Sequence, residues 1–347
     1  MLVFTLLACQ DYGFAQGADV EAPRDDVMPY APGDHDSAEP HLPDDIGAVS
    51  GRICDPSGAN WVVGAMVSTL VDGVEVFTLT DADGSFLLSD LPPGDYTLLV
   101  QKGSFSTSFD VHVVGGEVST LSDPECLDPS EVDIAVVTGE YDSIEHILDD
   151  LGLAYDSFDG TQGSAFISFL GDPTALGAYD IVFINCGLSW DWYGSGGAIG
   201  DSLRTYVEEG GSLYVSDWSA GLVEAAYPDL VDWYGSDATI TEALAGASGT
   251  HKGVVVDANM QLLLGAQQAD LSFDYNNWAV AEKESQQATV LVRGKAPLDA
   301  GGEVPGSPLA LRYDSPGSGR LLFTSFHNES QNTLDMDLLL LEIILSL

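Results

Sequence analysis

The stretch Tyr179-Asp180-Ile181-Val182-Phe183-Ile184-Asn185 decides the fold of the larger part of this chain. Its unbroken apolar run is typical of a strand buried on both faces, as the strands of a parallel sheet are. Apolar residues then recur with helical spacing over residues 199–207, Gly210-Gly211 ends that helix, and residues 212–215 form a second apolar strand. A strand, a helix and another strand in this order predict one unit of a parallel α/β sheet.

The same alternation extends outward on both sides of that unit. Residues 133–137 form an apolar run, and residues 144–151 follow with helical spacing. Near the end of the chain, an apolar strand at 320–326 precedes a helical stretch at 334–345. We therefore predict that residues 131–347 form an α/β doubly wound parallel sheet of the flavodoxin-like type.

The pattern is weaker between residues 237 and 319. Three apolar stretches there are typical of strands, and a segment rich in Gly and Pro at 301–308 is typical of a loop. We expect this region to add an extra β layer to the same domain, with strands near 254–256, 288–292 and 309–313.

The charge of the chain excludes several classes of partner. The 347 residues include 10 Lys or Arg and 55 Asp or Glu, which gives a formal charge of −45. Such a field repels nucleic acid, and it rules out adhesion to an anionic membrane through a basic patch. No stretch reaches the ~20 apolar residues of a membrane-spanning helix. Because 45% of the residues are apolar, a sizeable core is still expected, and the length allows about two domains.

The first nine residues resemble the signal peptide of a bacterial lipoprotein. A short apolar run ends in Leu6-Leu7-Ala8-Cys9, which is similar to a lipobox whose cysteine is lipidated. No Lys or Arg precedes the run, which departs from the pattern and is explained if the true start codon lies upstream. The alternative is an ordinary buried strand. The resemblance implies a lipid anchor at Cys9 and a place in the bacterial cell envelope, facing the periplasm or the exterior.

Residues 10–46 are expected to form an acidic, disordered tether. Arg24 is the only Lys or Arg before Asp45, prolines are scattered throughout, and apolar periodicity is almost absent. Such a segment cannot bury enough surface to offset the entropy of ordering. Repulsion between its carboxylates would extend it into a stalk.

Residues 47–124 have a sequence pattern that is typical of a β-sandwich. Short alternating strands are separated by Gly, Pro and Asp turns at intervals of 8 to 12 residues. Within them, Gly51-Arg52-Ile53, Asp55-Pro56-Ser57-Gly58 and Leu91-Pro92-Pro93-Gly94-Asp95-Tyr96 resemble the carboxypeptidase regulatory-like domain, a prealbumin-like sandwich. The resemblance implies a spacer or a weak binding module and no catalysis.

The cysteines divide into three groups. Cys54 lies on the first strand of the sandwich and Cys126 just beyond its last strand, so in an exported protein these two are expected to form a disulfide. Cys9 is the candidate for lipidation. Cys186 is then the odd thiol, and we expect it to act as a small buried apolar side chain.

The second domain resembles the class I glutamine amidotransferase-like superfamily, which includes trehalose-utilisation-type proteins. Residues 179–183, the helix that ends in Glu208-Glu209-Gly210-Gly211, and Ser212-Leu213 match its strand–helix–Gly-Gly–strand unit. In catalytic members the next strand ends in a sharp turn that holds a nucleophilic cysteine; here residues 214–219 read Tyr-Val-Ser-Asp-Trp-Ser. The family's His-Pro-Glu is matched by His327-Asn328-Glu329. The resemblance therefore implies the fold without its nucleophile.

The absence of the nucleophilic cysteine from residues 214–219 leaves two hypotheses for the function. The favoured one is a non-catalytic domain for binding or assembly, with a glycan or an envelope protein as partner. The alternative is a hydrolase of a glycan or amide, in which Ser216 or Asp217 acts with His327 and Glu329. The same residues also fit a structural role, in which Ser216 and Asp217 cap a helix and His327 makes a hydrogen bond at a strand end.

The predicted binding site lies at the carboxyl edge of the parallel sheet, where open α/β sheets bind their ligands. Asn185, Trp190, Trp192 and Trp218 should lie there, and the tryptophans suit stacking on a sugar ring. Alternatively, the tryptophans pack beneath the 191–198 loop.

No metal site and no cofactor are expected from residue spacing. The histidines are scattered without paired ligand spacing, and Asp81, Asp83 and Gly84 lack the spacing and the closing Glu of an EF-hand. Weak calcium binding by the acidic surface is the exception that the charge allows.

Overall fold

The computed structural model describes residues 42–328 and 333–347. Cys9, nearly all of the expected tether and Glu329 lie outside the described residues. The described residues belong to one compact unit. No helix in the described part of the chain is both long and apolar enough to cross a membrane.

The first domain is a β-sandwich, as predicted. Its two sheets have the orders β4-β1-β7, with β8 also paired to β1, and β3-β2-β5-β6. Alternate residues of the strands, including Val49, Val67 and Leu98, are fully buried between the sheets. The strands are β1 (Gly47–Cys54), β2 (Met66–Val71), β3 (Val74–Leu79), β4 (Ser85–Leu91), β5 (Gly94–Lys102), β6 (Phe105–Val113), β7 (Val118–Thr120) and β8 (Glu125–Cys126).

A disulfide joins Cys54 to Cys126 and confirms the predicted pair. The parallel register of β1 and β8 places the two residues directly opposite each other. The bond spans 72 residues of sequence and so encloses nearly the whole sandwich.

The second domain is built on a nine-stranded mixed sheet in the order β10-β9-β11-β12-β21-β20-β19-β15-β16. The first five strands are parallel, which confirms the doubly wound prediction, and the remaining pairs are antiparallel. The parallel strands are β9 (Ile134–Thr138), β10 (Asp156–Asp159), β11 (Ile181–Ile184), β12 (Ser212–Ser216) and β21 (Arg320–Thr324). The others are β15 (Gly249–Val255), β16 (Gln268–Phe273), β19 (Ala288–Pro297) and β20 (Glu303–Asp314). Four strands of the expected elaboration thus continue the sheet, and its shorter strands pair in two separate two-stranded sheets.

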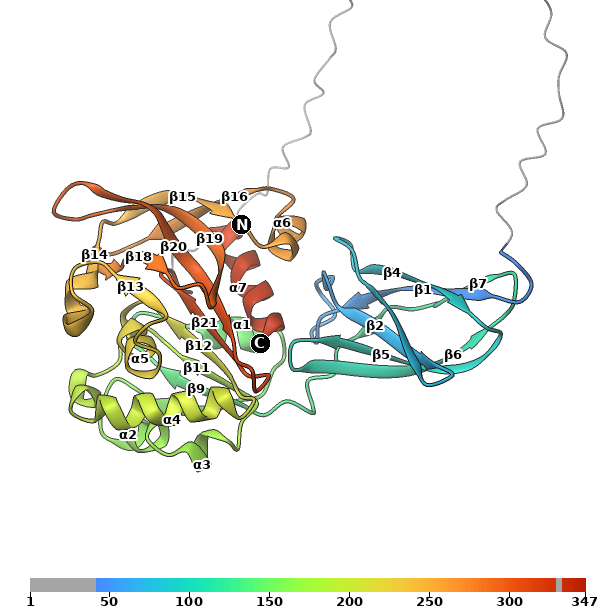
Figure 1. Cartoon of the computed structure of the whole chain (residues 1–347), viewed down its shortest axis with the longest axis horizontal. Coiled ribbons are helices and arrows are strands. Elements are labelled where there is room, and N and C mark those ends of the chain that lie inside the picture. Colours follow the sequence, from blue (N-terminus) through green and yellow to red (C-terminus); the bar gives the residue numbers. More distant parts are fainter. Residues whose placement is uncertain (1–41, 329–332) are drawn as a thin grey trace, which may run out of the picture. The chain divides into compact units, whose positions relative to one another are not determined.

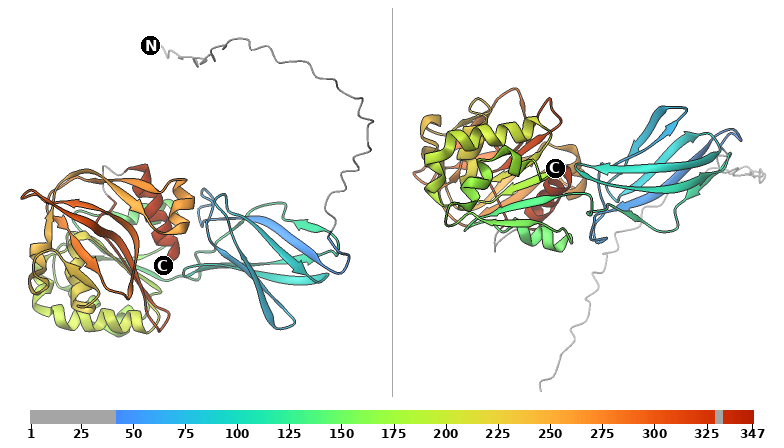
Figure 2. Two further views of the ribbon diagram at one scale, coloured as in Figure 1. Left: turned by 45° about the horizontal axis from the view of Figure 1, so that its top comes forward. Right: turned by 90° about the horizontal axis from the view of Figure 1, so that it is seen from below.

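Helices cover both faces of the parallel half (Figures 1 and 2). Ile134 and Val136 of β9 belong to a core with α1 and α7, whereas Ala135 and Val137 belong to a second core with α2, α4 and α5. This alternation explains the unbroken apolar runs, because both sets of side chains are buried. The helices are α1 (Ile144–Asp150), α2 (Ala165–Leu170), α3 (Pro173–Leu176), α4 (Gly196–Glu208), α5 (Ala220–Ala226), α6 (Ala258–Leu264) and α7 (Leu334–Ser346).

Short elements follow the carboxyl ends of the strands. A 3₁₀ turn at Asp217–Ser219 follows β12, and the two-residue strand Trp278–Ala279 (β17) packs beside it. The remaining elements are the 3₁₀ segments Trp190–Ser195 and Asp237–Ala243 and the strands β13 (Val231–Trp233), β14 (Leu244–Gly246) and β18 (Ala281–Glu284).

Candidate functional site

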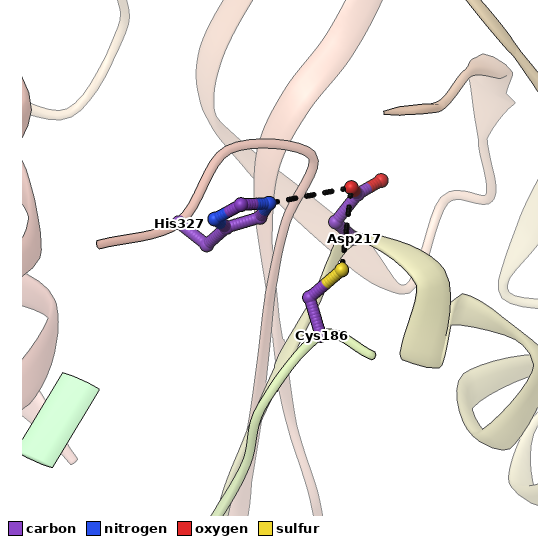
Figure 3. Close-up of side chains that lie close together, drawn as sticks. All are labelled: Cys186, Asp217 and His327. Carbon is purple, nitrogen blue, oxygen red and sulfur yellow. Dashed lines mark hydrogen bonds and ion pairs between the residues drawn. The ribbon is translucent and has the colours of Figure 1, made fainter. Parts of the chain in front are cut away.

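Three side chains meet where β11, β12 and β21 end (Figure 3). Cys186 lies two residues beyond β11, Asp217 directly follows β12, and His327 lies three residues beyond β21. The parallel register of the three strands brings their carboxyl ends to one edge of the sheet. The predicted residues Asp217 and His327 are thus brought together, and Cys186 joins them.

Asp217 occupies a sharp turn between a strand and a helix. Its φ of 40° lies in the left-handed region, which is uncommon for a residue other than glycine, although Asp tolerates it better than most. The amide of Ala279 donates a hydrogen bond of 2.6 Å to Asp217 Oδ1. This bond fixes the carboxylate and leaves Oδ2 directed at the other two members of the cluster.

Asp217 Oδ2 lies 3.5 Å from Cys186 Sγ and 3.5 Å from His327 Nε2. Cys186 is 1% exposed. Burial holds the pKa of the Cys186 thiol well above its usual range, and the adjacent Asp217 carboxylate is the second-largest cause. Because the thiolate is the nucleophilic form, Cys186 is poorly suited to attack a substrate at neutral pH.

Ser216 belongs to a different network. Its hydroxyl donates to Asp142 Oδ2 and accepts a 2.9 Å hydrogen bond from the amide of Cys186. The amide of Asn328 donates to Asp142 Oδ1 at 3.1 Å. Burial raises the pKa of the Asp142 carboxyl, and the nearby His327 opposes that rise. The structure therefore gives Ser216 a buried hydrogen-bonding role and does not place its hydroxyl on His327.

A cavity of about 330 Å³ opens above the cluster. Its walls carry four aromatic side chains, of which Tyr141 and Trp218 meet edge to face at 5.4 Å between ring centroids. Trp218 Nε1 donates a 2.9 Å hydrogen bond to the carbonyl of Asn277, which fixes the orientation of the indole. The volume falls within the range of small-molecule sites. The lining residues are Tyr141, Cys186, Asp217, Trp218, Asp274, Tyr275, Asn276, Asn277, Trp278 and His327.

The other predicted binding residues lie outside this cavity. Asn185 is buried, and its amide nitrogen donates to Glu145 Oε2 at 2.8 Å. Trp192 is buried in the core beside α4. Trp190 is 44% exposed and lines a neighbouring hollow that shares Tyr141 and Trp218.

Sequence reasoning missed two contributors to the site. The segment 274–278 connects β16 to β17 and supplies half of the lining residues. Its string Asp-Tyr-Asn-Asn-Trp combines polar and aromatic residues, and this is a signal that could have been recognised. Tyr141 and Asp142 follow β9 at the same sheet edge and carried no motif.

Residues 48–123 match the sequence profile of the carboxypeptidase regulatory-like domain, which confirms that resemblance. No curated protein matches the chain. Among solved structures, a candidate GMP synthase component from Thermoplasma acidophilum is 12% identical with a TM-score of 0.42, over 62% of this chain and 94% of that one. A glutamine amidotransferase from Thermotoga maritima is 8% identical with a TM-score of 0.36, over 56% and 75%. The 5-hydroxyisourate hydrolase of Klebsiella pneumoniae is 23% identical with a TM-score of 0.20, over 24% and 91%.

Proposed function

We propose that this protein is a lipid-anchored binding protein of the bacterial cell envelope, and that its α/β domain binds a neutral, polyhydroxylated ligand such as a sugar unit of a glycan. The observation that carries the proposal is the cavity at the sheet edge, which combines aromatic walls with carboxylate and amide groups. Aromatic faces pack against the apolar faces of a sugar ring, and carboxylates and amides hydrogen-bond its hydroxyls.

The charge of the cavity favours a neutral ligand over an anion. Asp217 and Asp274 contribute carboxylates, and His327 is the only basic side chain among its described lining residues. An anionic ligand would be repelled by the two carboxylates and by the field of the whole chain. In this proposal the sandwich acts as a spacer and Cys9 carries the lipid.

Calorimetric titration of the full-length protein with neutral mono- and oligosaccharides tests the binding function. We expect binding that Trp218→Ala abolishes, because the indole forms one wall of the cavity. Trp61→Ala removes a partly exposed tryptophan from the sandwich and should leave binding unchanged. Absence of saccharide binding at millimolar concentration, or equal affinity in Trp218→Ala, would contradict the proposal.

Mass spectrometry of the mature amino terminus tests the anchor separately. The expected species begins at an acylated Cys9. An intact Met1 or an unmodified Cys9 would remove the anchor from the proposal without affecting the binding site.

The turn at Asp217 favours a second candidate, a hydrolase acting on a glycan or amide. A carboxylate in a left-handed turn, with an imidazole nitrogen 3.5 Å from its oxygen, is an arrangement that nucleophilic or acid–base catalysis can use. Turnover of chromogenic glycosides or amides that is lost in both Asp217→Asn and His327→Gln would favour the hydrolase over the binding protein.

A further inference from the structure

We propose that Cys186, Asp217 and His327 form a zinc site at the floor of the cavity, with one coordination position open toward the ligand. A thiolate, a carboxylate oxygen and an imidazole nitrogen are the donors from which protein zinc sites are built. Here the three donor atoms come from three separate segments of the chain and all lie within 4.8 Å of one another.

The distances between the donors fit a tetrahedral ion. With bonds of about 2.3 Å to sulfur and about 2.0–2.1 Å to nitrogen and oxygen, tetrahedral angles separate sulfur from oxygen by about 3.5 Å and nitrogen from oxygen by about 3.4 Å. Both observed separations from Asp217 Oδ2 are 3.5 Å. The third edge, from Cys186 Sγ to a ring nitrogen of His327, is at most 4.8 Å. A movement of the imidazole by about 1 Å brings that edge to the tetrahedral value.

The backbones that carry the donors are held by one hydrogen-bond network. Asp142 accepts from Ser216, which precedes Asp217, and from the amide of Asn328, which follows His327. The Ser216 hydroxyl in turn accepts from the amide of Cys186. One buried carboxylate and one hydroxyl thus fix the main chain at all three donors, as the outer partners of metal ligands do.

The orientation of the three side chains also supports a zinc site. Asp217 Oδ1 is taken by the amide of Ala279, so Oδ2 is the oxygen left for a metal. All three residues line the cavity, and an ion held by them would face it. The fourth ligand would be water or an oxygen of the bound molecule, as in zinc sites that keep one open position. Thiolate and imidazole donors select zinc or a similar transition ion over calcium or magnesium.

The test uses the full-length protein after treatment with a chelator. Zn²⁺ is titrated in competition with a chromophoric chelator, and Co²⁺ serves as a spectroscopic probe. We expect one Zn²⁺ per chain, and a Co²⁺ complex with thiolate charge-transfer absorption in the near ultraviolet. Cys186→Ser should abolish that band and weaken Zn²⁺ binding by more than the roughly 10–100-fold that loss of an outer partner costs. His327→Gln should weaken binding but retain the band.

Two control variants separate this site from other donors. Cys9→Ser removes the remaining cysteine of the chain and should keep the band, since Cys54 and Cys126 are joined in a disulfide. His112→Gln removes an exposed imidazole that lies 2.7 Å from an Asp95 carboxylate oxygen, a similar pair without a thiol, and should leave Zn²⁺ binding unchanged.

Several results would overturn the zinc site. These are a Co²⁺ complex without a thiolate band, a band that survives in Cys186→Ser, or several weak equivalents of Zn²⁺ bound equally by wild type and all variants. The last result would assign the metal to the acidic surface. If Cys186→Ser does not fold, as judged by circular dichroism, the wild-type Co²⁺ spectrum and His327→Gln still decide. Saccharide binding is measured without added metal, so either proposal can fail while the other stands.

Discussion

Substitution of Ser216 by alanine tests whether this residue is a structural element of the site. In wild type its buried hydroxyl donates to the Asp142 carboxyl and accepts from the amide of Cys186. Alanine removes both hydrogen bonds, and water cannot restore them at a position that is fully buried. The amide of Cys186 is then left without this acceptor.

The expected loss of stability follows from these two bonds. A hydrogen bond to a charged group contributes about 1.5–3 kcal/mol, and a buried donor left unsatisfied costs about 1–3 kcal/mol. We therefore expect Ser216→Ala to lower the free energy of unfolding by about 3 kcal/mol or more. Ser219→Ala is the matched control, because the equally buried Ser219 hydroxyl makes a single neutral bond of 2.8 Å, to the carbonyl of Asn185, and should cost about 1 kcal/mol.

Unfolding of both variants is followed by tryptophan fluorescence. The signal comes mainly from the α/β domain, because only Trp61 belongs to the sandwich and the other five tryptophans lie in the α/β domain. For a domain of this size, about 3 kcal/mol corresponds to a fall in Tm of about 6–12 °C. A Ser216→Ala variant within about 0.5 kcal/mol of Ser219→Ala would refute the reasoning. It would show that the Asp142 network adds little to the stability of the sheet edge.

Three further predictions concern other parts of the molecule. Replacing both Cys54 and Cys126 by serine should destabilise the sandwich by about 4 kcal/mol in the chain-entropy model for a loop of 72 residues, measured by denaturant unfolding against the oxidised wild type. Burial raises the pKa of Glu224 from an ordinary 4.5 to about 7, and the nearby Asp237 carboxylate adds to this rise. Between pH 4.5 and pH 7, Glu224 is therefore protonated in the folded state and ionised in the unfolded state. The stability of the wild type should therefore fall as the pH rises from about 4.5 to about 7. Glu224→Gln removes this fall, so its Tm should be higher than that of the wild type at pH 8 and equal to it at pH 4. Asp217→Asn should keep the fold, because the oxygen of its side-chain amide can still accept from the amide of Ala279. Asp217→Ala loses that acceptor and places alanine in a left-handed turn, so in denaturant unfolding it should lower the free energy of unfolding by about 2–4 kcal/mol.

The parallel half of the sheet was predictable from sequence because its strands are buried on both faces. Runs such as Ile181–Ile184 have no polar side chain to place on a solvated face, so their apolar character shows directly in the sequence. Helix α7 was found for a similar reason: its apolar run is buried nearly all round. The disulfide followed from chain position and from the expected export of the protein, because Cys54 lies on the first strand of the sandwich and Cys126 just beyond its last long strand.

The antiparallel half was harder to predict. Strand β16 (Gln268–Phe273) alternates polar and apolar residues, but charged and amide side chains on its open face dilute the signal. The strands β14 and β17 are three and two residues long, and pairing with distant partners defines them more than their own composition does. No local pattern specifies such pairing.

The candidate site was predictable only as far as strand ends could be located. Asp217 and His327 follow recognisable strands, so their convergence could be inferred from the parallel topology. The inward direction of Cys186, the burial of Trp192 and the arrival of the 274–278 segment depend on side-chain direction and on a long-range connection. These are tertiary facts that a single sequence does not encode in any short window.

The end of β12 explains why this edge is suited to binding. Ser216, the last residue of β12, enters the buried Asp142 network, while Asp217, one residue later in the left-handed turn, faces the cavity. The side chain at the turn is a carboxylate, and beside it lies the Cys186 thiol, whose pKa burial raises well above its usual range. A carboxylate at this point accepts hydrogen bonds from hydroxyls or binds a cation. The same backbone would present a serine nucleophile only if the serine were shifted by one position, and that shift would break the hydrogen-bond network of Ser216 that holds the edge together.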